Sequence, residues 1–391
     1  MKLLNSQIMS SNHSNKIIVA SAGSRKTSYI VKEALSNPTD NILILTYTID
    51  NINQIRNYIT QANGFIPTNI TILSWFSFLL QECVRPYQNF VYSDKRIETV
   101  FFPPDIGKFK VNRRFIKKAN IKDYFLVGGK YIINEHISEF SCLCNDKSNG
   151  KVIGRLEEIY SKIFIDEVQD ISGYDFDIVE LLLKSKIQNY LVGDCRQATY
   201  FTTCSPKYKK YKGKNIINLF NDWQSKGLCS VVEKNDCYRS NQIICDFADG
   251  FYPHLTKTQS FNSETTGHDG LFILNENQVF NYIEKYNPTI LRWDKSADTL
   301  GLEAKNFGTT KGQTFERVLI FPTDSFKKYL SDGKLTKLIK KKNKKTQVVT
   351  EEIKDTFHLA KFYVATTRAR HSVAFVFSGN SIFDQLKPYK E

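Results

Sequence analysis

Short apolar runs alternate with helical patterns along the first half of the chain. Runs rich in Ile, Val and Leu predict buried strands, and the segments between them place apolar residues at helical spacing. The predicted strands are 16–20, 41–46, 69–73, 162–165 and 189–192, and the predicted helices are 27–35 and 50–62. Because strands and helices alternate, we expect a parallel sheet with right-handed crossovers.

The same pattern returns after about residue 225. The predicted strands there are 271–274, 289–291, 317–321 and 372–377, and residues 240–251 predict a helix. The sequence therefore predicts the α/β class with two parallel-sheet lobes. We expect the lobes to cover residues 1–204 and 231–391, with a linker region at 205–230.

Two segments break this rhythm. Residues 84–150 contain Pro86, the pair Pro103-Pro104, the pair Gly128-Gly129 and a basic block, which indicates an insertion in the first lobe. The stretch Lys334–Lys345 holds seven lysines, and such a charge run predicts a solvated loop or a frayed helix.

Composition bounds the class of protein. The 391 residues are 41% apolar, enough for sizeable cores, and the length indicates two or three domains. No apolar run is long enough for a membrane span, and the N-terminus lacks the apolar region of a signal peptide, so we expect a cytoplasmic protein. The eight cysteines form no CxxC pair, which favours reduced thiols over a metal cluster. The net charge of +14 favours a polyanionic partner over a merely solubilising surface.

An acidic pair follows one of the predicted strands. Residues 163–170 read Ile-Phe-Ile-Asp-Glu-Val-Gln-Asp. Open α/β sheets bind ligands at the carboxyl ends of their strands. Asp166 is therefore a candidate Mg²⁺ ligand, and Glu167 a candidate to polarise a water beside a nucleotide phosphate. The alternative interpretation is a solvated turn.

A candidate phosphate loop lies between the first predicted strand and helix. Residues 20–27 read Ala-Ser-Ala-Gly-Ser-Arg-Lys-Thr. Backbone N–H groups at such a helix start attract phosphate, Lys26 would reach the β- and γ-phosphates, and Thr27 would contact Mg²⁺. Arg25 stands where such loops carry Gly, so it either crowds the phosphates, adopts an unfavourable φ, or adds a cation. The alternative is a helix start without a ligand.

The ordered set of motifs resembles superfamily 1 helicases of the UvrD/Rep type. Each motif alone is short, but their order along the chain follows the family. The matching segments are 4–7 (Leu-Asn-Ser-Gln), 20–27, 46–48 (Thr-Tyr-Thr), 71–76 (Thr-Ile-Leu-Ser-Trp-Phe), 166–170, 192–197 (Val-Gly-Asp-Cys-Arg-Gln), 237–240 (Cys-Tyr-Arg-Ser), 310–315 (Thr-Lys-Gly-Gln-Thr-Phe) and 363–369 (Tyr-Val-Ala-Thr-Thr-Arg-Ala).

This resemblance implies two RecA-like lobes with an ATP cleft between them, and the cofactors ATP and Mg²⁺. By resemblance, Gln7 and Tyr238 hold the adenine, and Asp166 and Thr27 assist the metal. Glu167 acts as general base. The residues implied at the phosphates are Ala22, Gly23, Ser24, Arg25, Lys26 and Thr27 in the loop, with Gln197, Arg239 and Arg368 at the γ-phosphate.

Single-stranded nucleic acid is bound by cations along its backbone and aromatic side chains under its bases. Residues near the family motifs and in the basic insertion fit this chemistry, whereas core packing is the alternative for Trp75 and Phe76. The candidate contacts are Tyr47, Thr48, Ser74, Trp75, Tyr200, Phe201, Lys110, Arg113 and Arg114. We expect single-stranded or partly duplex DNA as the partner, bound with little sequence specificity.

Only about 70 residues separate Ser240 from Thr310, an interval in which large members of the resembled family carry an accessory subdomain. The leading hypothesis is an ATP-dependent single-stranded DNA translocase or helicase. One alternative is an ATP-gated DNA-binding sensor, or a partner subunit of a separate nuclease, that does not itself unwind. Another is a relative that does not hydrolyse ATP. Family analogy alone indicates DNA repair or anti-phage defence.

Overall fold

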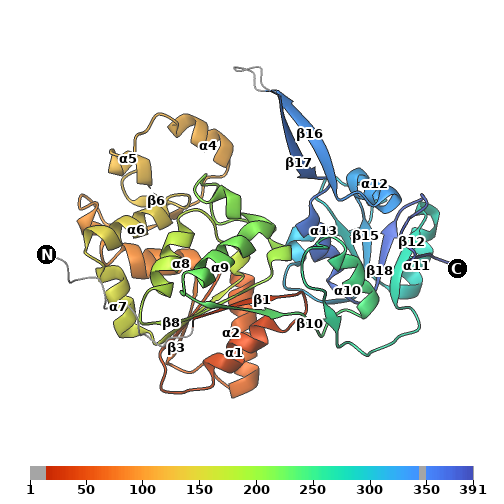
Figure 1. Ribbon diagram of the computed structural model, residues 1–391, viewed down its shortest axis with the longest axis horizontal. Coiled ribbons are helices and arrows are strands. Elements are labelled where there is room, and N and C mark those ends of the chain that lie inside the picture. Colours follow the sequence, from red (N-terminus) through yellow and green to blue (C-terminus); the bar gives the residue numbers. More distant parts are fainter. Residues whose placement is uncertain (1–14, 343–348, 391) are drawn as a thin grey trace. The chain divides into compact units, whose positions relative to one another are not determined.

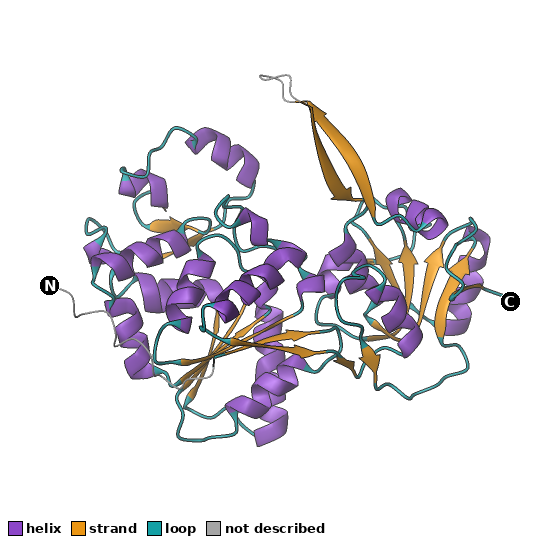
Figure 2. Cartoon of the chain, in the orientation of Figure 1, coloured by secondary structure: helices purple, strands orange, loops and turns teal. Residues whose placement is uncertain are grey.

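The computed structural model describes residues 15–342 and 349–390, and it divides into two compact units. The first lobe contains residues 15–19 and 26–233, and the second lobe contains residues 20–25 and 234–390. Each lobe is built on a sheet with helices packed against it (Figure 2). Gln7 lies outside the described residues.

The first lobe has a six-stranded sheet in the order β3-β2-β7-β8-β1-β9. The recorded pairs from β3 to β1 are all parallel, and the central strands are buried because the sheet is covered on both faces. The strands are β1 (Lys16–Ala20), β2 (Ile42–Thr46), β3 (Ile70–Ser74), β7 (Lys162–Asp166), β8 (Gln188–Gly193) and β9 (Ser230–Lys234). The helices outside the insertion are α1 (Lys26–Ala34), α2 (Ile49–Asn63), α3 (Trp75–Phe78), α7 (Lys151–Ile159), α8 (Asp175–Leu183) and α9 (Ile216–Ser225).

The second lobe has a six-stranded, fully parallel sheet in the order β14-β13-β15-β18-β12-β19. Its core is rich in aromatic residues, and Phe326 stacks on Phe362 with ring centroids 3.9 Å apart. The sheet strands are β12 (Gly270–Leu274), β13 (Thr289–Arg292), β14 (Lys305–Asn306), β15 (Phe315–Phe321), β18 (Ala369–Val376) and β19 (Leu386–Pro388). The other elements are β10 (Asp236–Cys237), β11 (Gln259–Ser260), α10 (Gln242–Asp249), α11 (Val279–Tyr286), α12 (Asp324–Asp332) and α13 (Leu359–Thr366). The two parallel sheets confirm the predicted α/β class with RecA-like lobes.

The insertion forms a small structure of its own on the first lobe (Figure 1). Its three strands run in the order β4-β6-β5, with β4 and β6 parallel and β5 and β6 antiparallel. The elements are β4 (Thr99–Phe101), α4 (Ile106–Arg113), α5 (Ile121–Phe125), β5 (Leu126–Val127), β6 (Tyr131–Ile133) and α6 (Ile137–Lys147). The basic block of the sequence therefore supplies α4 and α5.

The sequence predicted a solvated loop or a frayed helix for the lysine-rich stretch, and this prediction is wrong. Its described part contains β16 (Thr336–Lys342), which pairs antiparallel with β17 (Val349–Asp355). The two strands form a ribbon that extends from the second lobe (Figure 1). Leu338 lies opposite Ile353, and Lys340 forms an ion pair with Glu351 at 3.4 Å. Cross-strand pairing of this kind offsets the low strand propensity of lysine.

Residues 205–230, where the sequence predicted a linker, belong to the first lobe. They contain α9, whose Trp223 is fully buried and lies 6.3 Å from Phe176 of α8, centroid to centroid. The Trp223 indole N–H donates to Glu180 at 3.1 Å. This anchoring explains why the boundary between the lobes falls after Glu233.

Candidate functional site

The acidic pair lies at the carboxyl end of β7. Asp166 ends the strand and is 6% exposed, and its carboxylate accepts a hydrogen bond of 2.9 Å from the Glu167 N–H. Glu167 adopts a left-handed backbone with φ 56° and ψ 40°. A non-glycine residue in this region carries strain of about 1–3 kcal/mol, so the surrounding structure must hold it there.

A chain of hydrogen bonds leads away from Glu167. The Gln169 side-chain amide donates to the Glu167 carboxylate, and its oxygen accepts from the backbone N–H of Asp194 at 3.0 Å. Asp194 in turn accepts from the Gln197 side-chain amide at 2.8 Å. We call Glu167, Gln169, Asp194 and Gln197 the carboxylate–amide relay. It connects the ends of β7 and β8 through side chains.

Gly193 makes this relay possible. A Cβ atom at this position would lie 2.2 Å from the Gln169 side-chain oxygen and 2.9 Å from Val168. Real Cβ contacts are never this short, so any larger residue at 193 would displace Gln169. The Gly-Asp step after a predicted strand was visible in the sequence, but Gln169 and Asp194 were not predicted as site residues because their partners come from a different strand.

The start of α1 lies at the same edge of the sheet. Lys26 and Thr27 are its first two residues, and its first turn contains no acidic residue. Strand register aligns Val19 with Gly193, and Val192 with Asp166. Residues following β1, β7 and β8 therefore emerge at a common edge of the sheet.

Residues 20–25 of the predicted phosphate loop group with the second lobe, whereas Lys26 and Thr27 belong to the first. Gly23 has φ 77°, and a Cβ atom there would lie 2.7 Å from Cys237 Sγ and 2.8 Å from Arg239 Cβ. The Gly23 carbonyl accepts a hydrogen bond of 3.0 Å from the Tyr238 N–H. Ala22 and Ser24 beside it are buried. Glycine is therefore required at position 23 both for its φ and for the close approach of the 237–239 segment.

Arg25 adopts φ 60°, the unfavourable conformation that the sequence raised as one possibility. The side chain is exposed, and its guanidinium lies 3.9 Å from the centroid of the Tyr238 ring. A cation over an aromatic face at this distance is attractive by about 0.5–1 kcal/mol at an exposed site. Tyr238, the residue implied for the adenine, thus has an arginine on its ring.

Cys237 precedes Tyr238 and has an unusual thiol. A hydrogen bond with Cys245 lowers the pKa of Cys237 below its ordinary value, aided by backbone N–H groups of Ser240 and Arg239, although burial opposes the shift. The Cys237 side chain is only 2% exposed. Its lowered pKa therefore reflects local donors, not access to solvent.

Arg239 and Arg368 are positioned by neighbouring motifs of the second lobe. Arg239 donates to the Thr314 hydroxyl at 2.8 Å and to the Thr367 carbonyl at 3.1 Å. Arg368 is 1% exposed and donates to the Val364 carbonyl at 3.1 Å. These bonds join the segments 237–240, 310–315 and 363–369, which are far apart in sequence.

The predicted nucleic-acid contacts differ in accessibility. Tyr200 is 45% and Phe201 38% exposed, and Lys212 Nζ lies 5.4 Å from the Phe201 ring centroid. Tyr47 is half-buried, and burial raises the pKa of its hydroxyl to about 12. Thr48 and Ser74 use their hydroxyls to cap α2 and α3. Tyr200 and Phe201 are therefore the most open aromatic candidates of this set.

Trp75 is a core residue, which corrects the prediction that it stacks on bases. It is 2% exposed, and its indole N–H donates to Asp175 Oδ1 at 2.9 Å. Asp175 is fully buried and also accepts from Ser138 and Thr202. Burial raises the pKa of Asp175, although these donors act in the opposite direction. The same ring that would stack on a base is needed to satisfy this buried carboxyl.

The three basic candidates of the insertion have distinct surroundings. Lys110 forms an ion pair with Glu135 at 2.8 Å. Arg113 donates to the carbonyls of Tyr124 and Leu126, and the Arg114 guanidinium lies 4.5 Å from the Phe115 ring centroid. Arg114 is exposed, whereas Arg113 is half-buried.

Two parallel α/β sheets, the first with polar residues gathered after the carboxyl ends of β7 and β8, define a protein of the RecA-like, two-lobe class. Within this class, residues 116–202 match the model of the UvrD/REP helicase N-terminal domain. The matched segment contains the acidic pair and the whole carboxylate–amide relay. The resemblance to UvrD/Rep-type helicases is confirmed by this match.

Solved helicase structures are similar to the chain at low identity. The helicase nonstructural protein 10 of an arterivirus matches with a TM-score of 0.45 and 14% identity, over 95% of this chain and 60% of that one. Its complex with DNA matches with a TM-score of 0.45 and 14% identity, over 95% and 61%. The PRRSV helicase matches with a TM-score of 0.43 and 15% identity, over 93% and 52%. The chain thus spans roughly half to three fifths of these proteins.

A search of curated proteins found no match. No helix within residues 15–342 and 349–390 is both long and apolar enough to cross a membrane.

Proposed function

We propose that the protein is an ATP-dependent translocase or helicase that acts on single-stranded DNA. The observation that carries the proposal is the carboxylate–amide relay, which leads from Glu167 to Gln197 along the sheet edge where α1 begins. A carboxylate at this edge, linked by hydrogen bonds to a second polar side chain, suits a site that both cleaves a phosphate and signals its loss.

Nucleotide binding in this proposal begins at α1. Lys26 and the N–H groups of the first turn attract the phosphates, and the absence of an acidic residue in that turn favours an anion there. The Thr27 hydroxyl and the Asp166 carboxylate are oxygen ligands of the kind that Mg²⁺ prefers. When bound, the ion would neutralise phosphate charge.

Hydrolysis is assigned to Glu167 acting on a water. Its left-handed backbone and its hydrogen bond from Gln169 restrict where the carboxylate lies, and such positioning is the main contribution of a protein to phosphoryl transfer. Arg239 and Arg368 of the second lobe would stabilise charge on the γ-phosphate. In this mechanism the second lobe closes on the bound nucleotide, and closing and opening drive movement along the strand.

Strand binding is assigned to exposed aromatic and basic residues of the first lobe. Tyr200 and Phe201 offer partly exposed rings directly after the relay segment, and stacking is worth about 1–3 kcal/mol per base. Trp75 takes no part because it is buried. Contacts to the phosphate backbone predict little sequence specificity and an affinity that falls with salt.

The test measures ATP turnover without nucleic acid and with single-stranded DNA, duplex DNA or RNA in parallel. We expect stimulation that is largest with single-stranded DNA. Glu167→Gln should lower the stimulated rate by about 10²–10⁴-fold because it removes the general base, and Lys26→Ala should abolish turnover. Glu158→Gln, an exposed carboxylate on α7, is the matched control and should retain the wild-type rate. Equal turnover by Glu158→Gln, Glu167→Gln and Lys26→Ala would refute the assignment.

A second candidate function is an ATP-gated DNA sensor, or partner subunit of a separate nuclease, that does not unwind. Two observations favour it. Arg25 is strained and lies on Tyr238, and the described second lobe holds only short elements between Ser240 and Thr310, with no accessory subdomain among them. A strand-displacement assay separates the two functions, because a translocating helicase displaces the strand in the presence of ATP and a sensor does not.

A further inference from the structure

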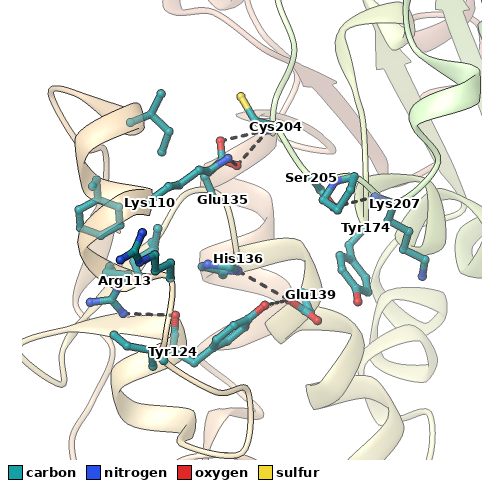
Figure 3. A pocket seen from close by; sticks show the side chains of 16 residues that line it. Lys110, Arg113, Tyr124, Glu135, His136, Glu139, Tyr174, Cys204, Ser205 and Lys207 are labelled. Carbon is teal, nitrogen blue, oxygen red and sulfur yellow. Dashed lines mark hydrogen bonds and ion pairs between the residues drawn. The ribbon is translucent and has the colours of Figure 1, made fainter. Parts of the chain in front are cut away.

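The insertion and the body of the first lobe enclose a cavity of about 540 Å³. This volume lies within the range of roughly 300–1,000 Å³ that is usual for pockets holding small molecules. Figure 3 shows Lys110 and Arg113 on one side of the cavity and Tyr174 and Lys207 on the other. All of these residues belong to the first lobe, so the cavity is a property of that lobe alone.

Aromatic rings form part of the walls. Phe109, Tyr124 and Tyr174 line the cavity together with His136. The Tyr124 and His136 ring centroids are 4.5 Å apart, and Lys207 Nζ lies 4.2 Å from the centroid of Tyr174. Rings contributed from both sides favour a flat, apolar-faced ligand.

The carboxylates of the cavity are already paired. Glu135 accepts from Lys110 at 2.8 Å and from the Cys204 N–H, and Glu139 accepts from Lys118 at 2.6 Å. Burial would raise the pKa of Glu139, but hydrogen bonds from His136, Lys118 and Tyr174 outweigh it and lower the pKa to about 2. The Glu139 side chain therefore remains an ionised acceptor inside the cavity, and it would repel an inserted acidic group.

Two arginines beside the cavity make no direct ion pair within the described residues, although the charge of Asp123 acts on Arg113. Within the described chain, neither Arg113 nor Arg114 forms an ion pair, and both line the cavity. Arg113 is bonded to backbone carbonyls, and Arg114 is exposed with its guanidinium on Phe115. An anion outside the cavity, near Arg114, would complete this arrangement.

The cavity lies next in the chain to Tyr200 and Phe201, the proposed contacts of the DNA strand. Cys204, Ser205 and Lys207 line it, and Phe201 precedes them by only a few residues. Lys212 joins the two regions, since it donates to the Thr203 carbonyl at 2.9 Å and lies over the Phe201 ring. A strand that stacks on Phe201 would therefore contact the chain close in sequence to residues that line the cavity.

We propose that the cavity receives one unstacked base of the bound single strand while an adjacent phosphate contacts Arg114. A base is flat, carries no charge and can donate its amino or ring N–H groups to Glu135 or Glu139, whereas its phosphates stay outside with the arginines. An acidic peptide fits less well because its carboxylates would face Glu135 and Glu139. This inference rests on the proposed function, since it concerns the same bound strand.

Cys204 provides a direct probe of the cavity. It is an exposed, free cysteine in the wall, whereas Cys229 is half-buried elsewhere in the first lobe and serves as an internal reference. We would measure the alkylation rate of both thiols with N-ethylmaleimide by mass spectrometry. The full chain would be saturated with oligothymidine, with an abasic strand of equal length, or with polyglutamate.

We expect oligothymidine to slow alkylation of Cys204 by about tenfold or more and to leave Cys229 unchanged, whereas the abasic strand and polyglutamate leave both rates unchanged. Equal protection by the abasic strand would show that no base enters, and protection by polyglutamate would show an acidic-peptide site. Either result overturns the inference.

Two matched variants test the phosphate contact. Arg114→Gln should weaken binding of oligothymidine about five- to tenfold in an anisotropy titration and reduce the salt slope by about 0.7. Lys117→Gln, an exposed cation on the same segment that does not line the cavity, should leave Cys204 protection unchanged. Loss of protection in Lys117→Gln but not in Arg114→Gln would also overturn the inference.

The two proposals fail in different ways. If oligothymidine binds and stimulates ATP turnover but does not protect Cys204, the cavity is not a base site and the proposed function stands. If the wild-type chain binds no single strand at all, the proposed function fails and the base site fails with it.

Discussion

The first lobe places Glu167 and Gln197 after the carboxyl ends of β7 and β8, whereas the second lobe places Arg239 after β10 and Arg368 directly before β18. The two lobes also hold these side chains by different means. In the first lobe, Glu167 and Gln197 are connected through the Gln169 side chain and through the backbone N–H and carboxylate of Asp194. In the second lobe, Arg239 and Arg368 donate to the backbone carbonyls of Thr367 and Val364. The first arrangement depends mainly on side-chain rotamers. The second depends mainly on the path of the main chain, with the Thr314 hydroxyl as a further acceptor for Arg239.

This difference follows from the chemistry of the groups. A carboxylate only accepts hydrogen bonds, so a neutral amide can hold it and pass a change of position onward. A guanidinium has five donors and is satisfied by carbonyls, which fix it in place. We therefore expect the first lobe to transmit the state of the nucleotide and the second lobe to supply fixed positive charge. Four predictions follow from this contrast.

The largest effect is expected for Arg368→Lys. Lysine keeps the positive charge but lacks the planar guanidinium, whose several N–H groups can bond the Val364 carbonyl and an anion at the same time. Because an arginine at the transferred phosphate is worth roughly 10³–10⁵ in rate, we expect the single-stranded DNA-stimulated ATPase rate to fall by about 10²–10³-fold. This fall in the ATPase rate is measured as steady-state turnover at saturating ATP.

Since Arg368 is buried, the melting temperature of the variant must first match the wild type. Arg239→Lys gives a second reading at a more open position, and Arg56→Lys, exposed on α2, is the control. If all three variants turn over equally, the second lobe supplies no charge to the reaction.

The next largest effect is expected for Glu139 of the first lobe, whose carboxylate is held by Lys118 and His136 and not by an amide. The pKa of Glu139 is lowered to about 2 in the folded state, from an ordinary value of 4.5. Its contribution to stability is therefore present above about pH 4.5 and is lost as the pH falls towards 2. We expect the free energy of unfolding to fall by about 2 kcal/mol more in the wild type than in Glu139→Gln between about pH 7 and pH 3.

Urea titrations at several pH values measure this difference. Parallel pH profiles of the two proteins would show that Glu139 keeps an ordinary pKa, and that ion pairing in the insertion does not stabilise the lobe.

A smaller effect is expected for Gln169→Leu. The substitution removes the amide that joins Glu167 to Asp194, so the two ends of the carboxylate–amide relay become independent. We expect the factor by which single-stranded DNA stimulates turnover to fall about tenfold, which corresponds to about 1.4 kcal/mol, with less change in ATP affinity. Turnover with and without DNA measures the factor.

Gly193→Ala should produce the same loss, because its Cβ displaces Gln169, whereas Gln224→Leu on the exposed surface of α9 should not. An unchanged stimulation factor in Gln169→Leu and Gly193→Ala would mean that the relay transmits nothing.

The smallest effect is expected at Arg25. Glycine tolerates φ 60° and alanine does not, so Arg25→Gly should be more stable than Arg25→Ala by about 1 kcal/mol. Both variants lose the contact with Tyr238, so the stability lost with this contact is the same in both and cancels when the two are compared. Thermal melts of the pair measure the difference, and an alanine variant as stable as the glycine variant would show that the loop relaxes away from the left-handed conformation.

Much of the fold was predictable because its strands are short apolar runs that end in polar residues. The pattern located β1, β2, β7 and β8 to within a residue or two, and it placed Asp166 and Lys26 at strand and helix ends. It failed for residues 205–230 and for the lysine-rich β16. In both segments the deciding contacts come from residues distant in sequence. Trp223 contacts Phe176 and Glu180, and the lysine-rich strand β16 pairs with β17.

The candidate site shows the same division. The positions of Glu167, Gln197, Arg239 and Arg368 were visible as motifs, and their roles stay predictions until they are measured. Trp75 looked equally suitable as a base-stacking residue, but a buried Asp175 requires its indole N–H. No local pattern distinguishes an aromatic ring that faces solvent from one that satisfies a buried carboxyl.

The sequence by itself determined the α/β class, the position of several strands along the chain and the polar residues that follow them, because these depend on local periodicity and on which residues follow an apolar run. Only the tertiary structure decided which side chains meet. The carboxylate–amide relay, the burial of Trp75, the contact of Arg25 with Tyr238 and the cavity of the insertion all join segments far apart in the chain. Their geometry depends on how those segments pack, and packing is a property of the whole fold.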